Sequence, residues 1–221
     1  SNPTLFAAVR DGGVVDAAWG QLQAGNTAIL WPPESSSDDA RQLVQAVNHS
    51  LDAQRVRMTQ AMVLDRTAPR VVVLEASSYV HLVDLLYMTW ETATVDTPAA
   101  DALEFAKFDE SQLARLTQLT EATYAGTQDC PAMNGRRPMC DVIAGYRATG
   151  SFRPENWCFV RAEGQDVGVL LLADHGAANF WELVYMGLVP ESRGQGWGRE
   201  MVRHAQRYVH VAGAERMLVG V

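Results

Sequence analysis

The alternation of apolar and polar positions divides the C-terminal half of the chain into short elements of regular length. Two strands joined in a hairpin come first, then a third, largely apolar strand, an amphipathic helix and a last strand. The pattern predicts them at residues 157–161, 167–173, 180–189, 199–212 and 216–221. Gly213 stands where the helix is expected to end.

The region before this hairpin predicts a strand, two helices and a long loop. Residues 103–108 alternate as a strand does, and Asp109 is placed to cap a helix that carries Leu113, Leu116 and Leu119 at helical spacing. A loop rich in Pro, Asn, Gly and Arg is expected over Thr127–Pro138, and a short helix over residues 141–148.

The N-terminal half follows part of the same plan. A hairpin, a strand, a helix, a further strand, a second helix and one or two last strands are predicted at residues 6–9 with 14–22, 27–31, 40–51, 56–63, 69–76 and 80–90. The strand that ends in Pro32-Pro33-Glu34 aligns with Leu188-Val189-Pro190-Glu191. We therefore expect an internal duplication with a period of ~155 residues.

Residues 91–102 are small, polar and acidic, and they show no apolar period. This composition is typical of a linker. We expect it to separate an N-terminal half at 4–90 from a C-terminal half at 103–221. The one or two strands predicted at residues 80–90 either close the first half or join the second.

Composition narrows the classes of function. The 221 residues carry a formal charge of −8, which disfavours a nucleic-acid-coating surface. No apolar stretch approaches the ~20 residues of a membrane helix. Lys107 is the only lysine, and the three cysteines show no CxxC spacing, so no metal site is expected. No export signal precedes the first strand, which favours a cytoplasmic location.

The segment from Pro190 to Gly198 contains the most informative chemistry. An apolar strand leads into three alternating glycines that open a helix, so free backbone N–H groups at the positive end of the helix dipole suit a diphosphate. A plain tight turn is one alternative. A dinucleotide fingerprint is another, although the spacing is Gly-x-Gly-x-Gly and the preceding hairpin is unlike a doubly wound sheet.

The sequence Arg193-Gly194-Gln195-Gly196-Trp197-Gly198 resembles the R/Q-x-x-G-x-G/A signature of GNAT-superfamily N-acetyltransferases, and the preceding strand from Glu182 to Leu188 fits as well. The resemblance covers the C-terminal half and implies an α/β fold with a mixed, mainly antiparallel twisted sheet between helices. It implies acetyl-CoA as co-substrate. The backbone near Met186 and Leu188 would pair with the pantetheine arm. The pyrophosphate would be held by the amides from Arg193 to Arg199, that is Arg193, Gly194, Gln195, Gly196, Trp197, Gly198 and Arg199.

The same resemblance implies that Glu182 is the general base, because several family members carry a catalytic glutamate on this strand. An ordinary strand-end glutamate is the alternative, and His175 is a weaker candidate base. Tyr185 alternates to the other face and is expected in the core. The family's usual general acid is a tyrosine on a helix that would lie beyond Val221, together with two further strands.

The N-terminal half resembles a degenerate second copy of this fold. Its loop reads Pro33-Glu34-Ser35-Ser36-Ser37-Asp38-Asp39, without glycine and with two carboxylates at the helix start. Carboxylates there suit the helix dipole but would repel a pyrophosphate. The hypothesis is that this half binds no CoA and serves packing or substrate shaping.

The acceptor is expected near the loop at Thr127–Pro138, where Asp129 could hold an amine and Arg136 or Arg137 a carboxylate; a solvated loop is the alternative. The cysteines, Trp181 and Trp197 are expected to pack, and His204 and His210 to be solvated or to cap their helix. The resulting prediction is acetyl transfer to a primary amine of a small molecule or peptide, by a monomer or homodimer. A non-catalytic acyl-CoA sensor and a nucleotide-dependent oxidoreductase remain as alternatives.

Overall fold

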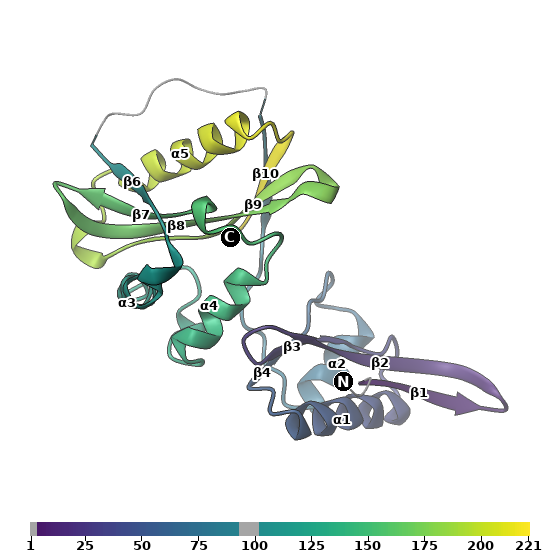
Figure 1. Cartoon of the computed structure of the whole chain (residues 1–221). Helices are drawn as coiled ribbons and strands as arrows, with labels where there is room; N and C mark the ends of the chain where they lie inside the picture. The colour runs from purple at the N-terminus through teal and green to yellow at the C-terminus, as the bar shows by residue number, and fades with distance from the viewer. Residues whose placement is uncertain (1–3, 93–101) are drawn as a thin grey trace. The chain divides into compact units, whose positions relative to one another are not determined.

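The computed structural model describes residues 4–92 and 102–221 (Figure 1). The chain divides into two compact units, one up to Leu82 and one from Val83 onward. Each unit has its own sheet and its own apolar core. Among the described residues, no helix combines the length and the apolar character needed to cross a membrane.

The first unit is a four-stranded sheet with two helices. Its strands lie in the order β1-β2-β3-β4, with β3 and β4 parallel and the other neighbours antiparallel. The bounds are β1 Leu5–Arg10, β2 Gly13–Gln23, β3 Thr27–Trp31, α1 Asp38–Ala53, β4 Met58–Gln60 and α2 Pro69–Ala76. Ser37 caps α1 by accepting the amide of Ala40 at 3.2 Å, and the apolar face of α1 packs on β2 and β3.

The second unit contains a six-stranded mixed sheet in the order β5-β10-β9-β8-β7-β6. Only β9 and β10 are parallel to each other; the other neighbouring pairs in this sheet are antiparallel. The strand bounds are β5 Tyr87–Glu91, β6 Glu104–Lys107, β7 Trp157–Ala162, β8 Gln165–His175, β9 Phe180–Leu188 and β10 Arg216–Gly220. The expected mixed, mainly antiparallel sheet is confirmed.

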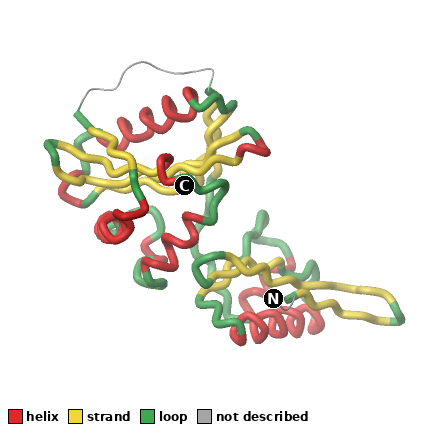
Figure 2. The backbone as a smooth tube through the Cα atoms, in the orientation of Figure 1, coloured by secondary structure: helices red, strands yellow, loops and turns green. Residues whose placement is uncertain are grey.

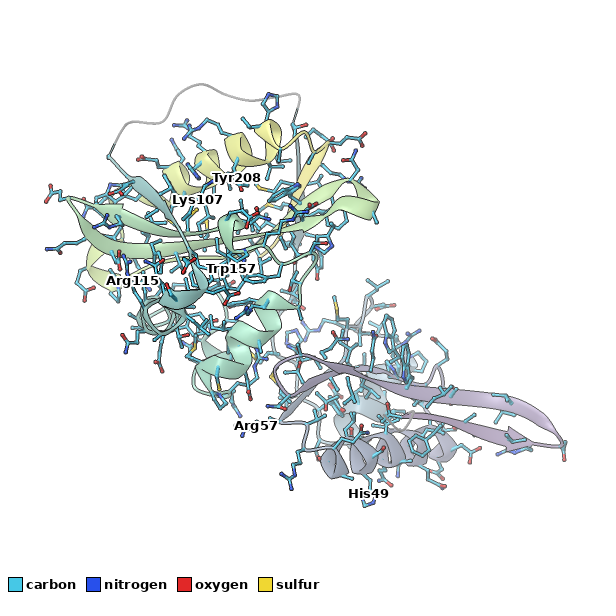
Figure 3. The ribbon with its side chains drawn as sticks, in the orientation of Figure 1. His49, Arg57, Lys107, Arg115, Trp157 and Tyr208 are labelled. Atoms are coloured by element: carbon cyan, nitrogen blue, oxygen red, sulfur yellow. The ribbon has the colours of Figure 1, made fainter. Side chains whose placement is uncertain are left out.

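Helices cover both faces of this sheet. α5 lies on one face, and α3 and α4 lie on the other (Figures 1 and 2). The helices are α3 Leu113–Thr123, α4 Met139–Arg147 and α5 Trp197–Val211, with short 3₁₀ turns at Glu110–Gln112, Pro131–Met133, Pro154–Asn156, Gly176–Ala178 and Pro190–Ser192. Trp157, labelled in Figure 3, is fully buried on the α3–α4 side, with its ring 5.8 Å from that of Phe108.

The two units repeat one series of elements. In the first unit the series is β1-β2-β3-α1-β4, and in the second it is β7-β8-β9-α5-β10. Both series have two antiparallel steps, then a helix, then a parallel strand. This common order is consistent with the tandem arrangement expected from the sequence.

The boundary expected at residue 90 needs correction. Strand β5 pairs antiparallel with β10 from Tyr87↔Gly220 to Glu91↔Arg216, so it belongs to the sheet of the second unit. The division therefore falls after Leu82, because main-chain pairing over a whole strand outweighs nearness in sequence. Most of the linker expected at 91–102 lies outside the described residues.

Candidate functional site

The edge of β9 becomes free partway along the strand. β9 pairs with β8 along its whole length, but it pairs with β10 only from Phe180↔Arg216 to Glu182↔Leu218. The two parallel strands part after Glu182, and no strand among the described residues takes the place of β10. The amide of Val189 donates to the carbonyl of Val167 on the β8 side. Because successive residues of a strand point to opposite edges, the amides of Leu188 and Met186 face the free edge.

A β-bulge lies where the strands part. Leu183 stands opposite Leu172 and Tyr185 opposite Leu171, so Val184 has no partner residue on β8. An extra residue of this kind bends its strand and increases its twist. It also shifts the alternation of side chains by one position. Tyr185 therefore lies on the α3–α4 side of the sheet, the same side as Glu182, and the expectation that the two face opposite ways is wrong.

The glycine loop has the conformation that an anion-binding site requires. Gly194 and Gly196 have φ of 79° and 82°, and α5 begins at Trp197 without a side-chain cap. Within the described structure the amides of Gly194, Gln195 and Gly196 have no partner, and those of Trp197 and Gly198 start the helix, where no preceding turn offers an acceptor. Two of the expected amides are engaged, since Arg193 donates to Pro190 and Arg199 to Gly196.

The side chain of Arg193 connects this loop to two other elements. Its Nε donates to the carbonyl of Leu188 at 3.0 Å, Nη1 to Gly126 at 3.0 Å and Nη2 to Thr123 at 2.8 Å. The Arg193 guanidinium is therefore engaged by backbone carbonyls and is not merely solvated. Three charge-assisted hydrogen bonds fix the end of β9 against the end of α3.

Glu182 lies at the last position where β9 and β10 pair. Its side chain is 34% exposed, and its Oε2 atom lies 3.0 Å from Nε2 of His175 at the end of β8. The His175 ring stacks on Phe180 with the ring centres 4.4 Å apart. The structure thus brings together the two residues that the sequence offered as separate candidate bases.

A cluster of three tyrosines, which sequence reasoning missed, lies on the same side of the sheet. The hydroxyls of Tyr124 and Tyr146 are hydrogen-bonded, and the Tyr185 hydroxyl lies 2.7 Å from Oγ1 of Thr123. Tyr185 packs against both other rings, with centres 5.4 and 5.3 Å away. Burial raises the pKa of all three phenols above the ordinary value, so each stays neutral at pH 7. No local sequence pattern predicts this cluster, because Tyr124, Tyr146 and Tyr185 are far apart in the sequence. They meet only when α3 and α4 pack on β9.

The loop expected to recognise the acceptor borders a cavity of about 290 Å³. Arg137 lines the cavity, Arg136 donates a hydrogen bond from its Nε to the carbonyl of Ala132, and Asp129 is exposed. The cavity lies between the end of α3, the loop and the start of α4.

Two cysteines and His204 were further candidates, and the structure shows how far each is buried. Cys158 is buried, which raises its thiol pKa to about 11, whereas Cys140 is exposed. Burial, helped by the nearby charge of Arg207, lowers the pKa of His204 to about 4, and its ring stacks on Phe105 with the centres 3.6 Å apart. The expectation that His204 is solvated is therefore wrong.

The corresponding loop of the first unit is already occupied by a carboxylate of the chain itself. Asp16 on β2 accepts the amides of Glu34 and Ser35, both at 3.1 Å, and the Ser35 hydroxyl at 2.7 Å. Two further carboxylates, Asp38 and Asp39, stand in the first turn of α1. This loop contrasts with the free amides that precede α5.

Comparison with known proteins finds a family match within the second unit. The family model described as Acetyltransferase (GNAT) family matches residues 121–221. None of the curated proteins matches the chain in sequence.

Solved structures resemble both units together. A GCN5-related N-acetyltransferase from Sphaerobacter thermophilus is 15% identical, with a TM-score of 0.61 over 96% of this chain and 69% of that chain. A GCN5-related N-acetyltransferase from Kribbella flavida is 15% identical, with a TM-score of 0.52 over 88% and 71%. A GCN5-related glucosamine N-acetyltransferase region of a fungal multi-domain β-N-acetylglucosaminidase is 13% identical, with a TM-score of 0.60 over 94% and 29%. These likenesses show a common fold.

Proposed function

We propose, for a chain whose C-terminal half belongs to the GNAT superfamily of acetyltransferases, that the protein transfers an acetyl group from acetyl-CoA to a primary amine. The amine would attack the thioester directly. The observation that carries this proposal is the row of free amides from Gly194 to Gly198, which lies next to a β-strand with an unpaired edge.

The loop and the strand edge suit two different parts of acetyl-CoA. The free amides at the start of α5 would hold the pyrophosphate, because they point outward at the positive end of the helix dipole. The amides of Met186 and Leu188 would pair with the pantetheine arm as with an added strand. Arg193 supports both parts, since its side chain fixes the end of β9 beside the loop.

Glu182 would act as the general base. An ammonium acceptor must lose a proton before its nitrogen can attack, and a half-exposed carboxylate can take that proton directly or through water. The nitrogen then bonds to the acetyl carbon while backbone amides of β9 stabilise the oxyanion. The C–S bond breaks, and the leaving CoA thiolate takes up the second proton that the nitrogen loses. His175 would orient the Glu182 carboxylate through the 3.0 Å contact.

Calorimetry and turnover measurements test the two roles separately. Wild type should bind CoA, and Glu182→Gln should keep that affinity while turnover falls about 10²–10⁴-fold. A protein that binds CoA with no turnover to lose would be an acyl-CoA sensor. Heat from NAD but not from CoA would favour the oxidoreductase.

A matched pair of glycines tests the loop. Gly196 and Gly213 lie before and after α5, have φ of 82° and 78°, and have open space where a Cβ would stand. Alanine at either position should strain the backbone by ~1–2 kcal/mol. Only Gly196→Ala should weaken CoA binding, about tenfold or more. Equal CoA affinity in the two variants would refute the assignment of this loop.

A further inference from the structure

The cavity beside α3 and α4 contains a cationic group with no anionic partner. Six of the residues that line it matter here: Glu121, Tyr124, Met133, Asn134, Arg137 and Met139. Arg137 is partly buried, and it has neither an ion pair nor a hydrogen bond within the described structure. Glu121 is exposed and does not pair with it. With no partner in the described structure, this guanidinium is available to a ligand.

The walls of the cavity are held in place by other contacts. Asn134 donates its Nδ2 to the carbonyl of Tyr124 at 3.2 Å, and Arg136 donates to Ala132 at 3.1 Å. The first bond holds the loop against the end of α3, and the second lies within the loop. Met139 and Val142 line the cavity on the side of α4, and the hydroxyl of Tyr124 is hydrogen-bonded to that of Tyr146 on the same helix.

The same wall connects the cavity to the reactive strand. Tyr124, which lines the cavity, packs its ring against Tyr185 of β9 with the ring centres 5.4 Å apart, and Tyr185 shares its face of the sheet with Glu182. At the other end of the wall, the carbonyl of Gly126 accepts a hydrogen bond from Arg193. A molecule in the cavity is therefore separated from β9 by one layer of tyrosine side chains.

We propose that this cavity binds a carboxylate of the acetyl acceptor through Arg137, so that the acceptor is an amino acid or a peptide with a free carboxylate. The planar guanidinium matches a carboxylate in two parallel hydrogen bonds. With one cation beside two methionines and a neutral tyrosine, the cavity favours a singly charged anion over a dianionic phosphate, since the Glu121 carboxylate opposes each added negative charge. The proposal rests on the proposed acetyl transfer for the role of this ligand as acceptor.

The binding experiment uses the full chain and two probes that differ only in charge. N-acetylalanine and N-acetylalaninamide are titrated and followed by saturation-transfer NMR, without CoA. Wild type should bind the acid about tenfold more tightly than the amide. Arg137→Gln should abolish that preference, and Arg136→Gln, on the neighbouring arginine, should retain it. Equal binding of the two probes, or a preference that survives Arg137→Gln, overturns the proposal.

Turnover and calorimetry then separate this inference from the proposed function. With acetyl-CoA, free amino acids and dipeptides should be acetylated faster than the corresponding amides. Comparison of the amino-acid rate with the dipeptide rate then distinguishes an amino-acid acceptor from a peptide acceptor. Arg137→Gln should leave CoA affinity unchanged. If it weakens CoA binding and spares the acid preference, Arg137 serves the co-substrate and the proposal is wrong. If CoA gives no heat while the acid preference persists, acetyl transfer fails and the carboxylate site stands.

Discussion

The carboxylate of Asp16 accepts hydrogen bonds from the loop that precedes α1 in the first unit. Partial burial acts to raise the pKa of this carboxyl, but the hydrogen bonds from the Ser35 hydroxyl and from the amides of Glu34, Ser35 and Ala17 outweigh it and hold the pKa below its ordinary value. The folded state therefore binds the proton less readily than the unfolded state. By linkage, this interaction stabilises the fold above the unfolded pKa of about 4, and the stabilisation is lost as the pH falls through the folded pKa.

Asp16→Asn should destabilise the protein by about 1 kcal/mol at pH 7, because a neutral amide accepts these hydrogen bonds less strongly than a carboxylate. The difference from wild type should shrink as the pH falls from the unfolded pKa of about 4 through the lower folded pKa of Asp16. Urea unfolding at pH 7 and pH 3 measures both values. Asp11→Asn is the control, since Asp11 is exposed in the β1–β2 turn at φ 51°, which asparagine tolerates. A difference that is the same at both pH values would refute the role of this carboxylate.

Strand β9 is positioned by a close approach at Gly187. A Cβ at this residue would lie 2.7 Å from Oγ1 of Thr123 and 2.7 Å from the Tyr185 hydroxyl. These two groups are hydrogen-bonded to each other and join the end of α3 to β9. The absence of a side chain at Gly187 therefore lets the helix reach the strand next to the glycine loop.

Gly187→Ala should lower the free energy of unfolding by about 1–3 kcal/mol, because the added methyl group must displace the Thr123–Tyr185 contact. Gly198→Ala is the matched control in the first turn of α5, where a Cβ meets nothing within 4 Å. That change should be neutral or stabilising, since alanine favours a helix by about 1 kcal/mol over glycine. Urea-unfolding midpoints compare the two variants, and a Gly187→Ala protein as stable as wild type would contradict this packing.

Local patterns predicted most elements of the fold, and pairings between distant segments escaped them. The strands at 157–161, 167–173 and 180–189 lie where the structure has β7, β8 and β9, because alternation reports which face is buried. The bulge at Val184 adds one residue without changing composition, so simple alternation placed Tyr185 on the wrong face. The pairing of β5 with β10 depends on a register that local patterns do not encode.

In the candidate site too, local features could be predicted from the sequence and contacts between distant residues could not. The glycine loop was recognised from its sequence, since positive φ at Gly194 and Gly196 is a local property. The sequence did not predict the partners of Arg193 or the contact between His175 and Glu182. Each of these contacts depends on how the strands of the sheet are placed in the folded chain. The sequence could not decide whether Arg136 or Arg137 would bind a carboxylate. Arg137 lines the cavity, which forms only where the end of α3, the loop and the start of α4 meet.

Across the whole molecule, the repeated order of elements contrasts with unequal chemistry in the two units. Both have a strand followed by a helix and a parallel strand. Only the second has glycines with free amides at the helix start, whereas the first fills that position with Asp16 and adds Asp38 and Asp39. Negative charge at this end of a helix repels a pyrophosphate.

The chain should therefore bind one CoA and not two. Titration calorimetry on the full chain should give a stoichiometry of one. Hydrogen exchange with CoA should protect the amides between Met186 and Arg199 and leave those between Glu34 and Ala40 unchanged, because Asp16 already accepts the amides of Glu34 and Ser35 and the carboxylates of Asp38 and Asp39 oppose an anionic ligand. Asp16→Ala is the informative variant: it frees the amides of Glu34 and Ser35, yet Asp38 and Asp39 remain, so the stoichiometry should stay at one. A second site, or protection near Pro33 in wild type, would show that the first unit also binds the co-substrate.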